Sequence, residues 1–114
     1  MQHDLQKYLL DVLESARLIQ EFVSGSNYDQ FTVDELVRAA VERKFEIIGE
    51  ALTRIKKQDP SLMDHITDHK RIIAFRNVIA HGYDMIVDRL VWEVIQDKLP
   101  VLITEVEKLI AMLK

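Results

Sequence analysis

Residues 76–83 read Arg-Asn-Val-Ile-Ala-His-Gly-Tyr, and the rest of the chain is organised around this stretch. It brings together a permanently charged guanidinium, an imidazole that titrates near neutral pH, and a phenol. An arginine matches two phosphate oxygens at once, and a histidine can accept or donate a proton at physiological pH. Arg76, His81 and Tyr83 therefore indicate chemistry on a phosphate group.

The segment before the histidine is predicted to be helical. Its apolar residues share one face at helical spacing: Ile72, Phe75 and Ile79. Gly82 is the residue type that commonly follows a helix end, so His81 would lie in the last turn, where carbonyl dipoles favour a protonated imidazole. At about 100° per residue, Arg76 and His81 lie roughly 140° apart on an ideal helix. Either the helix end frays to bring them together, or a second copy of the protein completes the site.

This pattern, R-x4-H-x-Y with Asn77 after the arginine, resembles the HEPN superfamily and, within it, the HepT-like toxins. Residues 42–51 also resemble the second helix of HepT-like proteins, and residues 92–100 resemble a later segment, so the resemblance covers nearly the whole chain. The resemblance implies a small, all-helical, metal-independent endoribonuclease that acts as a homodimer. It also implies a partner, a nucleotidyltransferase antitoxin of the MntA type, in a type VII-like toxin–antitoxin system.

Composition sets the outer bounds. The chain has 114 residues, 48% of them hydrophobic, which predicts one domain. The resemblance implies that this is a single HEPN-like domain over residues 1–114. It has no cysteine, its first residues lack the pattern of a signal peptide, and no apolar run has the length of a membrane span. We therefore expect a cytoplasmic protein with no membrane association.

The charge is unevenly distributed. The formal net charge is −4, but residues 54–81 contain six Lys or Arg and only three Asp. A basic segment around the motif is what an RNA site requires, although a chance cluster on a solvated face would look the same. Arg71 belongs to this segment and is a candidate RNA contact.

The whole pattern predicts an all-α fold, an antiparallel bundle of four long helices with one short helical turn. The long helices are expected at residues 3–23, 32–57 and 69–81 and from about 88 to the C-terminus, with the turn at 60–66. A capping box of Thr32 and Glu35 would open the second helix, and Asp68 would cap the third. Pro100 interrupts the last helix, but the apolar spacing continues through it, which favours a kink or two nearly collinear helices.

The second predicted helix has an apolar arc that covers about half its circumference, enough for an internal core and a partner surface together. Lys44 falls near the middle of this arc and Arg43 at one flank. Lys44 either extends its amine to the edge of the arc, or borders a cleft between protomers where it and Arg43 face an RNA backbone.

His65 and His69 have the spacing of two metal ligands on one helix, but residues 66–68 suggest a helix boundary between them, and no third ligand is evident. We expect no metal and no cofactor. Metal-free RNA cleavage needs a base for the 2′-hydroxyl, a group that stabilises the phosphorane, and an acid for the leaving oxygen. His81 from each of two protomers would supply the base and the acid, Arg76 would stabilise the charge, and Asn77 would position a neighbour, leaving a 2′,3′-cyclic phosphate.

Two further expectations come from the family resemblance. The RNA target would be tRNA, and Tyr83 would accept AMP from the antitoxin, which would neutralise the toxin. Two other functions stay open: a catalytically silent helical partner of the nucleotidyltransferase, and a non-enzymatic RNA-binding module.

Overall fold

The structure, a computed structural model, describes residues 2–81 and 85–113, with only the backbone described at residues 2–3, 80–81 and 85–87. The helices are α1 (Gln2–Val23), α2 (Tyr28–Val33), α3 (Glu35–Gln58), the 3-10 helix η1 (Pro60–His65), α4 (His69–His81), α5 (Met85–Glu93), the π-helical segment η2 (Val94–Lys98) and α6 (Leu99–Leu113). No strand occurs in these described ranges. The all-α prediction is confirmed.

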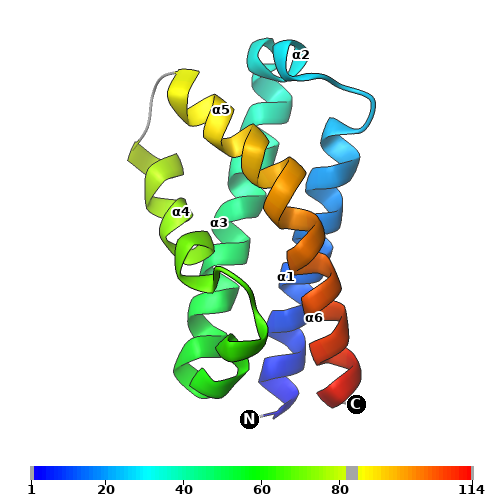
Figure 1. Ribbon diagram of the computed structural model, residues 1–114, viewed down its shortest axis with the longest axis vertical. Helices are drawn as coiled ribbons and strands as arrows, with labels where there is room; N and C mark the ends of the chain where they lie inside the picture. The colour runs from blue at the N-terminus through cyan, green and yellow to red at the C-terminus, as the bar shows by residue number, and fades with distance from the viewer. Residues whose placement is uncertain (1, 82–84, 114) are drawn as a thin grey trace.

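The long helices form an elongated bundle of 42 × 27 × 20 Å, with α1 packed against both α3 and α6 and α4 packed along α3 (Figure 1). The core is built from one apolar stripe on each long helix. Its most completely buried side chains are Leu9, Val12 and Ile19 of α1, Val41, Ile48, Leu52 and Ile55 of α3, and Leu99, Val106 and Leu109 of α6. None of the helices in the described ranges is long and apolar enough to cross a bilayer.

The start of the second long helix differs from the prediction. Thr32 does not cap it, because Thr32 lies inside the short helix α2, and α3 begins at Glu35 with Asp34 as its cap. The Asp34 carboxylate accepts the backbone N–H of Val37 at 3.1 Å. The capping box exists, but one helix earlier, between Asn27 and Gln30. This extra helix buries Phe31 against Trp92, with ring centroids 5.4 Å apart, a tertiary contact that local sequence patterns do not contain.

The last helical stretch begins at Met85, three residues before the expected start, and runs on through Pro100. The backbone adapts in η2, just before the proline, where the N–H of Leu99 bonds to the carbonyl of Val94, five residues earlier. Proline has no N–H and its ring collides with the carbonyl four residues earlier in an α-helix. The wider π turn is where such a helix can absorb that conflict, so α5, η2 and α6 form the single interrupted helix that the apolar spacing predicted.

Candidate functional site

The motif helix α4 packs against α3 with the face that the sequence predicted. Ile72, Phe75 and Ile79 are all buried, and the rings of Phe75 and Phe45 meet edge to face at 5.1 Å. The described part of α4 extends to His81, the residue before Gly82. The opposite face of α4 is thereby left to carry polar side chains.

Arg76 lies on α4 where that helix crosses Gly49 of α3. A Cβ atom placed on Gly49 would lie 3.3 Å from the Cβ and 3.4 Å from the Cδ of Arg76, so the arginine's aliphatic stem rests on the bare backbone of the glycine. Arg76 itself is exposed and forms no ion pair with any described residue. Its stem is therefore held while its guanidinium remains available. The sequence shows a glycine at position 49 in the middle of a predicted helix. It does not show that Arg76 packs against this glycine.

The structure describes little of the other two residues of the R-x4-H-x-Y motif, His81 and Tyr83. His81 is described by its backbone alone, as the last residue of α4, and Tyr83 lies outside the described residues. Asn77 is exposed next to Arg76. Their expected roles in proton transfer, AMP acceptance and positioning stay predictions.

A surface hollow of about 330 Å³ lies between α3 and α4 beside the arginine. It is lined by Thr53, Lys56, Lys70, Ile73, Ala74, Arg76 and Asn77. Three of these side chains are cationic, and no acid lines the hollow among the described residues. Lys56 and Lys70 belong to the basic segment identified in the sequence, but their position beside Arg76 was not predicted, because it depends on the packing of two separate helices.

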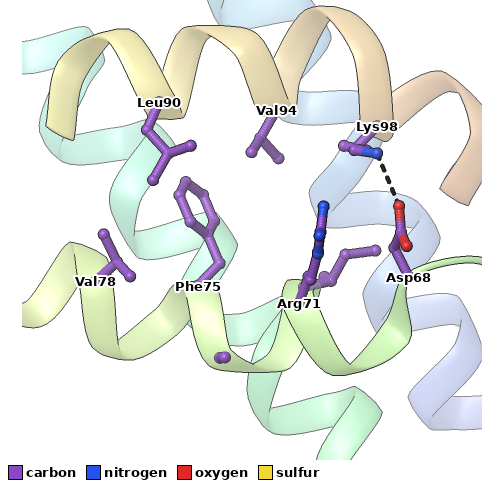
Figure 2. A pocket seen from close by; sticks show the side chains of 9 residues that line it. Asp68, Arg71, Phe75, Val78, Leu90, Val94 and Lys98 are labelled. Carbon is purple, nitrogen blue, oxygen red and sulfur yellow. Dashed lines mark hydrogen bonds and ion pairs between the residues drawn. The ribbon is translucent and has the colours of Figure 1, made fainter. Parts of the chain in front are cut away.

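The three cations proposed from sequence as RNA contacts lie in different surroundings. Arg43 is exposed on α3 and pairs with Glu46 at 3.3 Å, while Lys44 is half-buried. Arg71 lies on the other side of α4, in an apolar groove that also includes Phe75, Leu90 and Val94 (Figure 2). None of the three lines the hollow beside Arg76.

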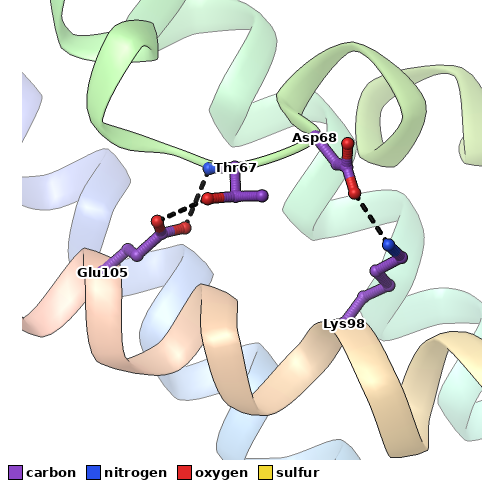
Figure 3. Close-up of polar contacts among 4 residues, drawn as sticks. All are labelled: Thr67, Asp68, Lys98 and Glu105. Atoms are coloured by element: carbon purple, nitrogen blue, oxygen red, sulfur yellow. Dashed lines mark hydrogen bonds and ion pairs between the residues drawn. The ribbon is translucent and has the colours of Figure 1, made fainter.

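The N-terminal end of α4 is anchored by two polar contacts (Figure 3). The Glu105 carboxylate of α6 accepts the backbone N–H of Thr67 at 2.8 Å and its hydroxyl at 2.7 Å. Lys98 donates a 2.7 Å hydrogen bond to Asp68, and this bond and the charge of Lys98 hold the pKa of the Asp68 carboxyl below its ordinary value. The carbonyl of Asp68 accepts the N–H of Ile72, so the residue stands at the expected cap position, with a left-handed φ of 57°.

The region after the motif is anchored to α3 by a buried ion pair. Asp88 of α5 is only 8% exposed and lies 3.2 Å from Arg38 of α3. Glu42, one turn along α3, has its pKa raised, chiefly by burial and also by the charges of Asp88 and Glu46, with Arg38 acting in the opposite direction. Polar contacts thus hold the start of α4 and the first turns of α5 to the rest of the bundle.

The two histidines with metal-ligand spacing are separated by a change of element. His65 ends η1 and His69 begins α4, which confirms the predicted boundary. Within the part of the chain that the structure describes, no three His, Asp or Glu side chains gather as metal ligands would.

The described ranges form an all-helical bundle whose helix α4 carries the R-x4-H motif, as the resemblance to the HEPN superfamily predicts. The sequence profile described as Ribonuclease HepT-like matches residues 12–109. The chain belongs to the HepT-like ribonuclease family.

Named relatives agree with this assignment. A protein of Methanocaldococcus jannaschii named "Putative RNase MJ1380" is 33% identical over 104 residues, which cover 91% of this chain and 94% of the relative. The "Probable ribonuclease HepT" of Thermococcus cleftensis is 30% identical over 109 residues, covering 96% of this chain and 98% of the relative. A third, the M. jannaschii "Gamma-glutamylcyclotransferase and putative RNase MJ0434", is 31% identical, and the match covers 96% of this chain but 49% of that longer protein. No solved structure matches the chain.

Proposed function

We propose that this protein is a metal-independent endoribonuclease whose composite active site is formed by Arg76 and His81 of two protomers. The observation that carries the proposal is the guanidinium of Arg76, which is held by its stem on Gly49, is exposed, and has no carboxylate partner among the described residues. An arginine that only stabilised the fold would be expected to pair with an acid. A free one beside two lysines suits an anionic substrate such as RNA.

The reaction follows from the groups available. One His81 accepts the proton of a 2′-hydroxyl, and the 2′-oxygen attacks the adjacent phosphorus. The bond to the 5′-oxygen breaks, and the second His81 donates its proton to that oxygen. Arg76 stabilises the added negative charge of the phosphorane. The products are a 2′,3′-cyclic phosphate and a 5′-hydroxyl, with no water, metal or cofactor consumed in this step.

The proposed homodimer accounts for the divergence of Arg76 and His81 on an ideal helix, since Arg76 of one copy can meet His81 of the other. The exposure of Val33 and Leu36 supports a dimer contact near the N-terminal end of α3, since both side chains are 81% exposed. They precede Arg38, whose ion pair with Asp88 brings the first turns of α3 to α5, the helix that follows the motif. Two apolar side chains so fully exposed favour a partner surface.

The test uses tRNA as substrate, with the wild-type protein and with His81→Ala and Arg76→Ala variants. Wild-type protein should produce new 2′,3′-cyclic phosphate ends in the presence of EDTA, and each variant should lose at least about 100-fold in rate while its thermal unfolding is unchanged. Loss of cleavage in EDTA with recovery on adding a metal would contradict the mechanism. Binding of RNA by all three proteins without new ends would instead identify an RNA-binding module.

We further propose a toxin that a nucleotidyltransferase antitoxin of the MntA type neutralises by transferring AMP to Tyr83. An AMP group adds bulk and negative charge two residues beyond His81, where RNA phosphate must approach, so repulsion and steric exclusion act together. After incubation with the partner and ATP, intact mass should increase by AMP units and cleavage should stop. Tyr83→Phe should gain no mass and stay active. Equal labelling of Tyr83→Phe would remove Tyr83 from the mechanism, and a silent adaptor would be revealed if His81→Ala leaves toxicity in cells intact.

A further inference from the structure

We infer that Lys56, Lys70 and the hollow they share form a second phosphate subsite, which binds the RNA backbone next to the scissile phosphate held by Arg76. The two lysines come from facing helices, α3 and α4, and line one hollow of about 330 Å³ with Arg76. The inference rests on the proposed function for its substrate and extends that function along the strand.

The charge of the hollow favours a phosphate. Its three ionisable lining residues are all cations, with no acid among the described residues that line it. Neither Lys56 nor Lys70 forms an ion pair with a described residue, and both are exposed. Three cations gathered without a counter-charge repel one another, and a bound polyanion removes that repulsion.

Two neighbouring cations on the same helices, Arg54 and Arg71, do not line the hollow. The guanidinium of Arg54 lies 5.7 Å from the ring centre of Tyr8 on α1. Arg71 lies in the groove on the α5 side of α4, where its charge contributes to the lowered pKa of Asp68. Thr53 lines the hollow, but its hydroxyl donates to the carbonyl of Gly49 at 2.8 Å. The two lysines, with Arg76 and the amide of Asn77, are therefore the donors left to bind a phosphate there.

The positions of Lys70, Arg76 and His81 along α4 suggest the line that a bound RNA strand follows. At 1.5 Å per residue, Lys70 lies about 9 Å from Arg76 along α4, and Arg76 lies about 7.5 Å from His81 on the other side. Arg76 thus stands between the proton-transfer residue and the lysine pair. A backbone that follows this line would place its scissile phosphate near Arg76 and a neighbouring, unreacting phosphate at the lysines.

A contact to an unreacting phosphate strengthens binding of substrate and transition state alike, so its loss raises KM and leaves kcat in place. The double variant Lys56→Gln/Lys70→Gln should raise the KM for tRNA cleavage about tenfold with kcat unchanged. Lys56→Arg/Lys70→Arg should restore the wild-type KM, because it keeps both charges. The matched control is Lys7→Gln/Lys108→Gln, which removes the same charge from exposed positions of α1 and α6 and should change neither constant.

A binding measurement separates the subsite from the nuclease. In a His81→Ala background, the affinity for a short fluorescein-labelled single-stranded RNA is measured by anisotropy over a range of salt concentrations. Each phosphate that is no longer neutralised lowers the steepness of log K against log salt by about 0.7. Loss of the lysine pair, which binds one phosphate, should therefore lower it by about that amount, and the control pair should not change it.

An unchanged KM and salt slope in Lys56→Gln/Lys70→Gln would overturn the subsite and leave the nuclease standing. A loss of kcat with KM unchanged would also overturn it, since the lysines would then act in the chemistry. A variant that loses affinity for ATP but not for RNA would also overturn the subsite, because the hollow would then bind a nucleotide and not an RNA backbone. If wild-type protein cleaves no RNA, the proposed function fails, and the salt slope still decides whether the hollow binds a nucleic-acid backbone.

Discussion

At the scale of single residues, the position of Arg76 depends on Gly49, which has no side chain to occupy the space of the arginine stem. The stem of the arginine lies against Gly49, in the middle of α3, where any Cβ would be 3.3 Å from the arginine's own Cβ. The arginine could be identified from sequence because its motif is local. The role of Gly49 could not be predicted, because the sequence does not show which other helix packs against it.

Gly49→Ala should therefore separate activity from stability. The alanine gains about 1 kcal/mol of helix propensity, while its methyl group crowds the arginine stem, so the net change in unfolding free energy should stay within about 1 kcal/mol. The guanidinium must move, and RNA cleavage should fall about tenfold or more. Kinetics and thermal denaturation measure the two effects.

The control is a double-mutant cycle with Arg76→Ala. Without the arginine stem there is nothing for the new methyl group to crowd, so Gly49→Ala should stabilise the Arg76→Ala protein by close to the full helix-propensity gain. Identical effects of Gly49→Ala in both backgrounds would contradict the contact.

At the scale of elements, the motif helix and its successor are each tied to the rest of the bundle by one polar cluster. The start and the buried face of α4 were predictable, since the change of element before it and its apolar spacing are local signals. The ties were not, because Lys98 with Asp68 and Arg38 with Asp88 join residues 30 and 50 positions apart. The same reason explains the missed helix α2, whose Phe31 is buried against a tryptophan far along the chain.

Lys98→Met should weaken the fold in a pH-dependent way. The folded pKa of Asp68 lies below its ordinary value of 3.8, so the contact stabilises the fold above about pH 4 and is lost as pH falls through the folded pKa. The variant should melt a few degrees below wild type at pH 7, and the gap should close in acid. A gap that stays constant with pH would show that Lys98 acts through packing alone.

Arg38→Met should cost about 2–4 kcal/mol, because it leaves the carboxylate of Asp88 buried without its partner. The loss should appear in urea denaturation at neutral pH. The double variant Arg38→Met/Asp88→Leu should recover most of it, since neither charge then remains. If the double variant is no more stable than Arg38→Met, the ion pair is not the source of the loss.

At the scale of the whole molecule, the wide apolar arc of the second predicted helix lies partly in the core and partly on the surface. Ile48, Leu52 and Ile55 lie in the core, while Leu36, and Val33 just before the helix, remain 81% exposed. The spacing of apolar residues predicted the width of this arc, and it predicted that the arc is wider than an internal core needs. It could not specify which end stays uncovered, because that depends on where α4 and α5 cross α3.

Leu36→Glu should disrupt the proposed dimer. A charge on an apolar contact surface must be desolvated in the complex, so the variant should sediment as a monomer at concentrations where wild type is a dimer. RNA cleavage should fall in parallel, since each site needs both copies. Leu10→Glu, a charge placed at an exposed leucine of α1, is the matched control. A Leu36→Glu protein that remains dimeric would move the interface elsewhere.

The contact between α1 and α6 also has a consequence for synthesis of the protein on the ribosome. The side-chain amide of Gln6 donates to the carbonyl of Leu113 at 2.9 Å, and the two helices lie side by side along the bundle (Figure 1). The part of the α1 surface that α6 covers therefore stays exposed until nearly the whole of this domain has been synthesised, although α3 is available to cover the rest much earlier. The complete bundle thus forms only after the last helix has left the ribosome.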